Sequence, residues 1–310
     1  MHIYIHTPIT NMASTSIRAP AKLHRTHDLQ THDGKHSSVG NMHPMAHLLL
    51  AAAAALLLSA APAARAQEAD DQKKFSYVAG AKNGPENWSK LNASWAKCNT
   101  GDRQSPIDLA TGRAKPMRSL GYLDYSYRPS PANVVNRGHD IEVKFTGNAG
   151  RLVIGGRAYQ LQQLHWHTPS EHTADGRRYD MELHLVHDDG NDNIAVIGIF
   201  YVIGNADPLL RQLEPAIRKI ADRKDQSEPV ESVDPRLAKS QGAVYYRYMG
   251  SLTTPPCTEG VIWTVFQRPR TVAKYQLDLL REAVADGYEN NARPIQKLNN
   301  REISIFIPEP

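Results

Sequence analysis

The 310-residue chain has few cysteines and few long apolar runs. Its two cysteines, Cys98 and Cys257, are too few to build a zinc site on their own and allow at most one disulfide. The one long apolar run, residues 48–60, is shorter than the roughly 20 residues that a membrane-spanning helix needs. No internal repeat or low-complexity tract is present. The sequence therefore excludes a cysteine-only metal module, a spanning helix in this run and a repeat array.

The apolar run at residues 48–60 is almost purely leucine and alanine, and polar residues follow it closely. Ala64-Arg65-Ala66 fits the small-residue pattern of a signal-peptide cleavage site. We therefore expect residues 1–66 to be an N-terminal extension and secretory signal peptide, and residues 67–310 to be one mature domain in the periplasm or outside the cell. A buried core helix is disfavoured, because the run has no polar face. No membrane span would remain after cleavage.

The mature part lacks a strong charge of either sign, with 31 basic against 30 acidic residues. Such a balance has no basic footprint, so we expect no nucleic-acid partner. The remaining length suits one domain with a substantial core. In an oxidising compartment Cys98 and Cys257 are expected to form a disulfide, with two separate buried thiols as the alternative. The bridge would close a loop of roughly 160 residues and contribute about 4 kcal/mol.

Apolar and alternating runs predict strands along the middle of the mature chain. The expected strands are residues 141–145, 151–154, 181–186 and 194–202. The last run is apolar on both faces, so we expect a central strand there. Helical periodicity appears at residues 209–220, interrupted by Pro215, and at residues 272–285. These patterns predict a mainly β single domain with peripheral short helices.

Histidines gather in one stretch of the mature chain. Six of the 14 histidines lie after residue 66, and five of these fall between positions 165 and 187. Side chains at i and i+2 of a strand point to the same face, so His165 and His167 present two imidazoles side by side, with Trp166 facing away. A neighbouring antiparallel strand would add His184. Three imidazoles with a fourth position left for water are typical of a catalytic zinc site.

Other histidines compete for the third position. His187 faces the other side of its strand from His184 unless a β-bulge intervenes, and His172 is the remaining alternative. Glu182 stands two residues before His184 and Gln163 two residues before the first histidine of the pair, so each can accept the second ring proton of its neighbour. The spacing predicts an open metal site, and imidazoles accept several divalent metals.

Three longer motifs match a known family. They are Gln163-Leu-His-Trp-His-Thr-Pro-Ser-Glu-His172, Met181-Glu-Leu-His-Leu-Val-His187 and Gly250-Ser-Leu-Thr-Thr-Pro-Pro-Cys257. With shorter matches at residues 83–88, 104–107, 136–139 and 291–294, the chain resembles the alpha-class carbonic anhydrases, particularly bacterial, exported ones. The resemblance implies a central, twisted, largely antiparallel sheet and reversible hydration of carbon dioxide to bicarbonate and a proton, the reaction of a zinc-dependent lyase.

The resemblance also implies a site. The ligands of Zn²⁺ would be His165, His167 and His184, at the bottom of a conical cleft. Gln163 and Glu182 would accept hydrogen bonds from ligand rings. The small-molecule partners would be carbon dioxide and bicarbonate, and the protein would be a monomer or a homodimer.

Further roles follow from the same resemblance. Thr253 would donate its hydroxyl proton to ionised Glu171 and so orient a zinc-bound hydroxide. His139 would pass the released proton to buffer, since a histidine titrating near about pH 6.5 suits that transfer. Carbon dioxide is apolar, so it needs an apolar wall. The substrate-binding residues would be Val186, Val196, Leu252, Thr254, Val261 and Trp263.

Departures from the family pattern lie near the expected shuttle. Arg137 stands where many relatives have asparagine, and its charge disfavours the protonated form of His139. Phe75 stands where relatives often carry tryptophan.

Two other functions compete with hydration. A non-catalytic binding module would lack a ligand histidine, whereas all three are present, and a zinc esterase activity is expected only as a side reaction.

Overall fold

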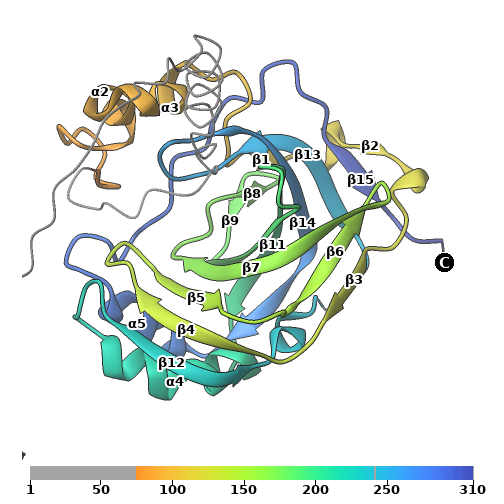
Figure 1. Ribbon diagram of the computed structural model, residues 1–310. Coiled ribbons are helices and arrows are strands. Elements are labelled where there is room, and N and C mark those ends of the chain that lie inside the picture. The colour runs from red at the N-terminus through yellow and green to blue at the C-terminus, as the bar shows by residue number, and fades with distance from the viewer. Residues whose placement is uncertain (1–74, 241, 310) are drawn as a thin grey trace, which may run out of the picture. The chain divides into compact units, whose positions relative to one another are not determined.

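The computed structural model describes residues 75–240 and 242–309, so the expected signal peptide and the boundary at residue 66 lie outside the described residues. A large sheet of 12 strands dominates this part, beside a sheet of three (Figure 1). The large sheet runs in the order β12 (Ser227–Val233), β4 (Ser130–Asn136), β5 (Ile141–Phe145), β7 (Arg157–His167), β10 (Met181–Asp188), β11 (Ile194–Ile203), β14 (Glu259–Val272), β13 (Tyr245–Ser251), β15 (Ser304–Phe306) and β2 (Lys115–Pro116). Off this path, β3 (Asp124–Tyr127) pairs with β6 (Gly150–Ile154), which pairs with β7. The small sheet holds β1 (Asp108–Leu109), β8 (Thr173–Ala174) and β9 (Arg177–Arg178).

Helices are short and peripheral in the described residues. They are α2 (Trp88–Leu91), α3 (Lys97–Thr100), α4 (Pro208–Ile220) and α5 (Lys274–Ala283), with 3-10 turns at Pro85–Asn87, Ala93–Trp95, Thr111–Arg113, Arg118–Leu120 and Pro235–Ala238. Both longer helices lie beside each other near β4 and β12 (Figure 1). No helix among the described residues has the length and apolar character needed to cross a membrane. The mainly β fold class is confirmed.

The expected strands all form, and β11 lies at the middle of the large sheet, as predicted. β10 is antiparallel to both neighbours, β7 and β11. Only two pairings in this sheet, β11 with β14 and β15 with β2, are parallel. Eight successive residues of β11 are buried, which explains why its sequence is apolar on both faces.

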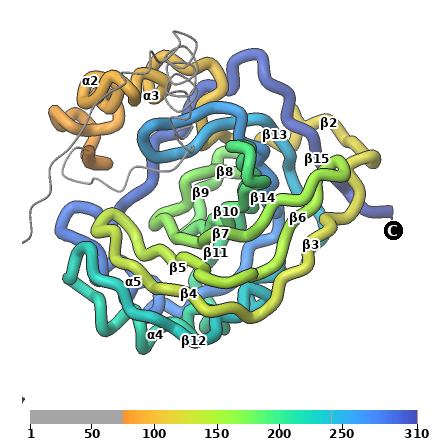
Figure 2. Tube along the Cα trace, viewed as in Figure 1, coloured from red at the N-terminus to blue at the C-terminus, as the bar shows by residue number. Residues whose placement is uncertain are grey.

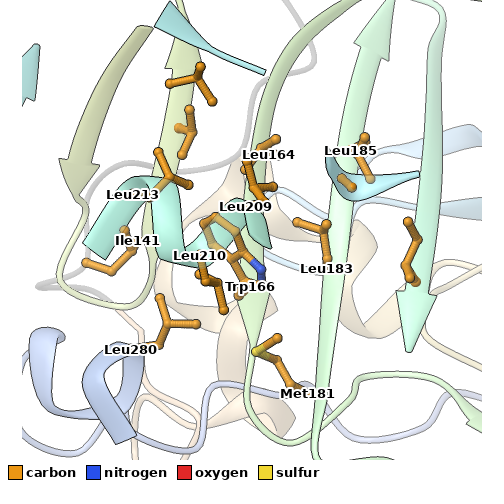
Figure 3. Packing of buried hydrophobic residues seen from close by; sticks show 14 of the residues in the cluster. Ile141, Leu164, Trp166, Met181, Leu183, Leu185, Leu209, Leu210, Leu213 and Leu280 are labelled. Carbon is orange, nitrogen blue, oxygen red and sulfur yellow. The ribbon is translucent and has the colours of Figure 1, made fainter. Parts of the chain in front are cut away.

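Strand β7 separates the main core from the site. Leu164 and Trp166 pack on the face that α4 covers, close to Leu209 and Leu210 (Figure 3). Burying each such leucine stabilises the fold by about 1.5–3 kcal/mol. Because side chains alternate along a strand, the histidines between and after these residues point to the opposite face.

Helix α4 corrects one expectation. Pro215 was expected to interrupt it, yet the helix runs unbroken from Pro208 to Ile220. Pro215 lies on the exposed side, where water can satisfy the carbonyl that loses its partner. The opposite side carries the buried residues Leu209, Leu210, Leu213, Ala216, Ile217 and Ile220. Burial of that side outweighs the lost backbone hydrogen bond.

The N-terminal helices are fastened to the C-terminal half. The expected disulfide between Cys98, in α3, and Cys257 is confirmed. Figure 2 shows the segment after α5 passing α2 and α3 on its way to β15. Arg293 of that segment donates to the carbonyl oxygens of Cys98, at 2.6 Å, and Ser105, at 2.8 Å. The disulfide and the hydrogen bonds of Arg293 therefore hold the same N-terminal region in place.

Candidate metal centre

Three buried histidines meet between β7 and β10. His184 of β10 pairs directly with His165 of β7, and His167 follows two residues later on the same face. One ring nitrogen from each of the three lies within 4.8 Å of the others, and all three side chains are at most 1% exposed. The structure thus brings together the three residues chosen from strand parity. Their role as ligands stays a prediction.

Each of these rings uses its other nitrogen in a hydrogen bond. Nδ1 of His165 donates to Oε1 of Gln163 at 2.8 Å. Nε2 of His184 donates to Oε1 of Glu182 at 3.0 Å. Both acceptors are the ones expected from the sequence. A proton on the bonded nitrogen leaves a lone pair on the opposite nitrogen, which is the form that binds a metal.

The third ring, His167, has an acceptor that the sequence did not reveal. Its Nδ1 donates to the backbone carbonyl of Asn291 at 2.9 Å. The Asn291 side chain also accepts from the backbone N–H of Thr168, at 2.8 Å, and donates to the carbonyl of His139, at 2.7 Å. A motif at residues 291–294 pointed to the region, but a backbone carbonyl leaves no residue signature.

The donor set suits zinc. Burial lowers the pKa of His165 and of His184, so these rings stay neutral and keep their lone pairs. Three buried imidazoles with hydrogen-bonded second nitrogens match a catalytic zinc site rather than a closed structural one. The residues present therefore fit the ion that the resemblance implies.

Glu182 holds two histidines at once. Its Oε1 accepts from His184 and, at 2.7 Å, from Nδ1 of His172. Its Oε2 accepts from the backbone N–H groups of Glu171 and His172 at 2.9 and 2.8 Å. Burial favours a raised pKa for Glu182, but the two imidazoles and their hydrogen bonds bring its pKa well below the usual range. His172 is thus a structural partner in this network.

His187 belongs to the other face. The pairing of β10 with β7 does contain a bulge, after Val186, but His187 then pairs with Leu161 of the main core. Its Nδ1 donates to the carbonyl of Ala195 at 3.1 Å, and its Nε2 accepts from the Tyr127 hydroxyl at 2.8 Å. Burial lowers the pKa of His187 to about 4. Both ring nitrogens of His187 are hydrogen-bonded within the protein, so neither is available to bind a metal.

Glu171 and Thr253 are both buried, at 0% and 1% exposure. Oε1 of Glu171 accepts from the backbone N–H of Arg293 at 2.9 Å. Its Oε2 lies 3.5 Å from Nε2 of His167 and 4.0 Å from Nδ1 of His184. The carboxylate therefore stands at the histidine group. The expected hydrogen bond between Thr253 and Glu171 stays a prediction.

An apolar cluster lies beside His184. Val186 shares the face of His184 and pairs with Val196, which in turn pairs with Trp263. The ring centres of Trp263 and His184 are 4.8 Å apart. Leu252 and Val261 belong to the same cluster, and Thr254 is fully buried. The residues expected to line the substrate site are thus gathered, with the exception of Thr254, in one cluster.

His139 differs from the expected shuttle. It is fully buried, and its ring meets Phe75 edge-on with centroids 5.3 Å apart. Burial, as the main cause, lowers the pKa of His139 to about 4 rather than leaving it near 6.5. Asp140 raises this pKa and Arg137 lowers it. Arg137 thus acts in the expected direction, but burial dominates.

Comparisons with known proteins match this geometry. A sequence profile of the eukaryotic-type carbonic anhydrases matches residues 83–306. Alpha carbonic anhydrase 7 of Arabidopsis thaliana is 46% identical over 241 residues, which cover 78% of this chain and 88% of that protein. The crystal structure of dioscorin complexed with ascorbate has a TM-score of 0.73 and 44% identity, covering 75% of this chain and 97% of dioscorin. The alpha-carbonic anhydrase of Thermovibrio ammonificans, in complex with the inhibitor sulfanilamide, has a TM-score of 0.66 and 38% identity, covering 74% and 98%.

Proposed function

This chain belongs to the eukaryotic-type carbonic anhydrase family, and from that premise we propose that it hydrates carbon dioxide reversibly, with zinc held by His165, His167 and His184. The single observation that carries the proposal is the buried group of three imidazoles, each with its second nitrogen hydrogen-bonded. When bound, zinc supplies hydroxide at neutral pH by acidifying water, as it does in carbonic anhydrases generally.

The protein's own part begins with orientation of the nucleophile. Thr253 would donate its hydroxyl proton to ionised Glu171, whose carboxylate already stands beside His167 and His184. A hydroxyl that donates in one direction keeps only lone pairs in the other. Thr253 would therefore accept the hydroxide's hydrogen and turn an oxygen lone pair toward carbon dioxide.

Carbon dioxide would bind against the apolar cluster around Trp263. Val186 and Trp263 lie next to His184, so a small apolar molecule there would be within reach of the nucleophile. Dispersion contacts and water exclusion would hold it, because it has no strong hydrogen-bonding group. Thr254 would bound the site on the side of Thr253.

Proton release would complete each cycle. We retain His139 as the carrier, with one condition that comes from its position. A fully buried imidazole has no contact with buffer, so it would have to leave its place against Phe75 to discharge a proton.

The cellular setting is also proposed. The leucine and alanine run before Ala66 favours export, and the disulfide between Cys98 and Cys257 is stable in an oxidising compartment. We therefore place the mature chain in the periplasm or outside the cell. The relatives come from plants as well as from bacteria, so a specifically bacterial, exported subgroup rests on the sequence motifs. A monomer or homodimer is proposed.

The test combines metal analysis with stopped-flow hydration. Purified protein should contain about one zinc ion per chain, and indicator traces should show carbon dioxide converted far faster than in buffer. Chelation should abolish the rate and added zinc should restore it. A zinc-loaded protein that hydrates carbon dioxide no faster than buffer would refute the proposal.

A further inference from the structure

A buried ion pair encloses the turn that carries His139. Nε of Arg137 donates to Oδ1 of Asp140 at 2.7 Å, and Nη2 of Arg137 donates to Oδ2 of Asp140. The backbone N–H of Arg137 also donates to the carbonyl of Asp140 at 3.0 Å. The Arg137 side chain is 6% exposed and that of Asp140 is 0% exposed. Such bidentate pairs have strong directional preference and fix the geometry of what lies between them.

The His139 ring makes no polar contact that would hold it. Neither ring nitrogen has a hydrogen-bond partner among the described residues, although the side chain is fully buried. The nearest carboxylate oxygen, Oδ2 of Asp140, lies 3.7 Å from Nε2 and accepts from Arg137 instead. A buried imidazole without hydrogen bonds is unfavourable. Something other than the ring's own polar interactions therefore keeps it inside.

Two sets of contacts can keep it there. The ring lies against Phe75, which packs edge-on against Trp88 and Trp95. The backbone is fixed where Asn291 donates to the carbonyl of His139. Neither contact is a hydrogen bond to the ring. The Arg137–Asp140 pair stands beside the ring, with Oδ2 of Asp140 3.7 Å from its Nε2.

We propose that the Arg137–Asp140 pair is a positioning device, which holds His139 against Phe75 and so limits proton exchange between the metal centre and buffer. The inference rests on the proposed function. Arg137 and Asp140 act through His139 and touch neither substrate nor metal. Opening the pair would let the imidazole turn outward, where it could be solvated and discharge its proton.

Oxygen-18 exchange separates the two steps of catalysis. In zinc-loaded protein, one rate reports the interconversion of carbon dioxide and bicarbonate, and the other reports proton transfer during release of labelled water. The double variant Arg137→Asn with Asp140→Ala removes both charges of the pair, and Glu142, whose Oε1 lies 3.6 Å from Nη1 of Arg137, then loses its cation. We expect its proton-transfer rate to rise about fivefold, with interconversion unchanged within about twofold.

Adding His139→Ala to the double variant should remove the whole gain. As a matched control, the exposed pair of Arg218 and Glu214, whose atoms approach to 2.7 Å, can be replaced by alanines, with no change in either rate expected. A gain that persists without His139 would overturn the proposal. So would an unchanged proton-transfer rate in the folded double variant.

A second measurement does not depend on catalysis. Diethyl pyrocarbonate modifies accessible imidazoles, and mass spectrometry of the peptide with residue 139 gives its rate. We expect slow reaction in the natural chain and at least tenfold faster reaction in the double variant, while His187 stays slow in both. If the double variant does not fold, Asp140→Asn supplies the comparison. Equal reactivity of His139 with and without the pair would overturn the proposal, whereas absence of hydration alone would refute only the proposed function.

Discussion

The two faces of β7 have the same backbone but opposite requirements. On one face Leu164 and Trp166 pack against apolar side chains, and shape and volume decide their contribution (Figure 3). On the other, His165 and His167 are equally buried, but hydrogen bonds to Gln163 and Asn291 decide their tautomer. Burial by itself thus does not distinguish a core face from a site face. The polar partners do.

The same contrast continues across β10. His184 lies on the site face and His187, three residues later, on the core face. Both are buried and neutral, yet His187 uses both ring nitrogens within the protein, whereas His184 uses one toward Glu182. The other nitrogen of His184 lies near ring nitrogens of His165 and His167, which is the arrangement that a metal site needs. The following experiments test this difference between faces.

The largest effect is expected on the site face. His184→Ala should remove zinc binding and reduce hydration to the buffer rate, since two imidazoles do not make a catalytic zinc site. Metal analysis and stopped-flow hydration measure both. His187→Gln is the matched change on the core face and should keep its zinc. Retention of more than about a tenth of the activity by His184→Ala would contradict the assignment of faces.

On the core face, stability should change instead of chemistry. Trp166→Ala should lower the free energy of unfolding by about 3–5 kcal/mol because it leaves a large cavity. Denaturant unfolding measures this, and hydration per folded molecule should stay within about twofold. Trp166→Phe is the control with a smaller cost, because the indole nitrogen has no hydrogen-bond partner among the described residues. Loss of activity with unchanged stability would show that the faces are not separate.

Acid should destabilise the core face through His187. Its pKa is about 4 in the folded protein, against about 6.5 in the unfolded chain, so the unfolded state binds a proton first as pH falls. Stability from this group is therefore complete above about pH 6.5 and lost progressively down to about pH 4. The loss approaches about 3 kcal/mol. Denaturant unfolding of metal-free protein at pH 7.5 and 4.5 should show a smaller difference for His187→Gln than for the natural chain, and equal differences would refute this account.

The smallest change concerns Glu182, the hydrogen-bond partner of the proposed ligand His184. Glu182→Gln keeps the shape of the side chain but removes the charge that orients His184 and His172. Zinc affinity should fall about 10- to 100-fold, as for other partners of metal ligands. Competition with a chelator measures it. Gln162→Ala, an exposed change in β7, should leave affinity unaltered, and a similar loss there would indicate a general effect on the strand.

Sequence patterns with local causes predicted much of this arrangement. Strand parity alone places His165 and His167 on one face, and apolar runs locate β5, β10 and β11. The resemblance supplied the roles of Glu171, Thr253 and the apolar wall. Each of these predictions used only residues close together in the sequence, or a motif shared with the family.

What escaped prediction depends on contacts across the fold. The carbonyl of Asn291 bonds His167 from 124 positions away, and no side-chain pattern encodes a carbonyl. His139 is buried with its ring against Phe75, a residue from the start of the described chain. The unbroken α4 depends on the core that its apolar side covers, which outweighs the local cost of Pro215.

The bond between Cys98 and Cys257 also orders events in time. The cysteines are 159 positions apart, and β1 to β13 lie between them in the chain. A ribosome therefore delivers the second thiol only after the residues of those thirteen strands have been synthesised. Oxidation of the native pair must wait for that moment, and the turn with Thr253, four residues before Cys257, arrives with it. A chain truncated before this turn would lack Thr253 of the proposed site. It would also lack Cys257, so no disulfide could hold its N-terminal helices. Synthesis of this short segment is therefore required for both.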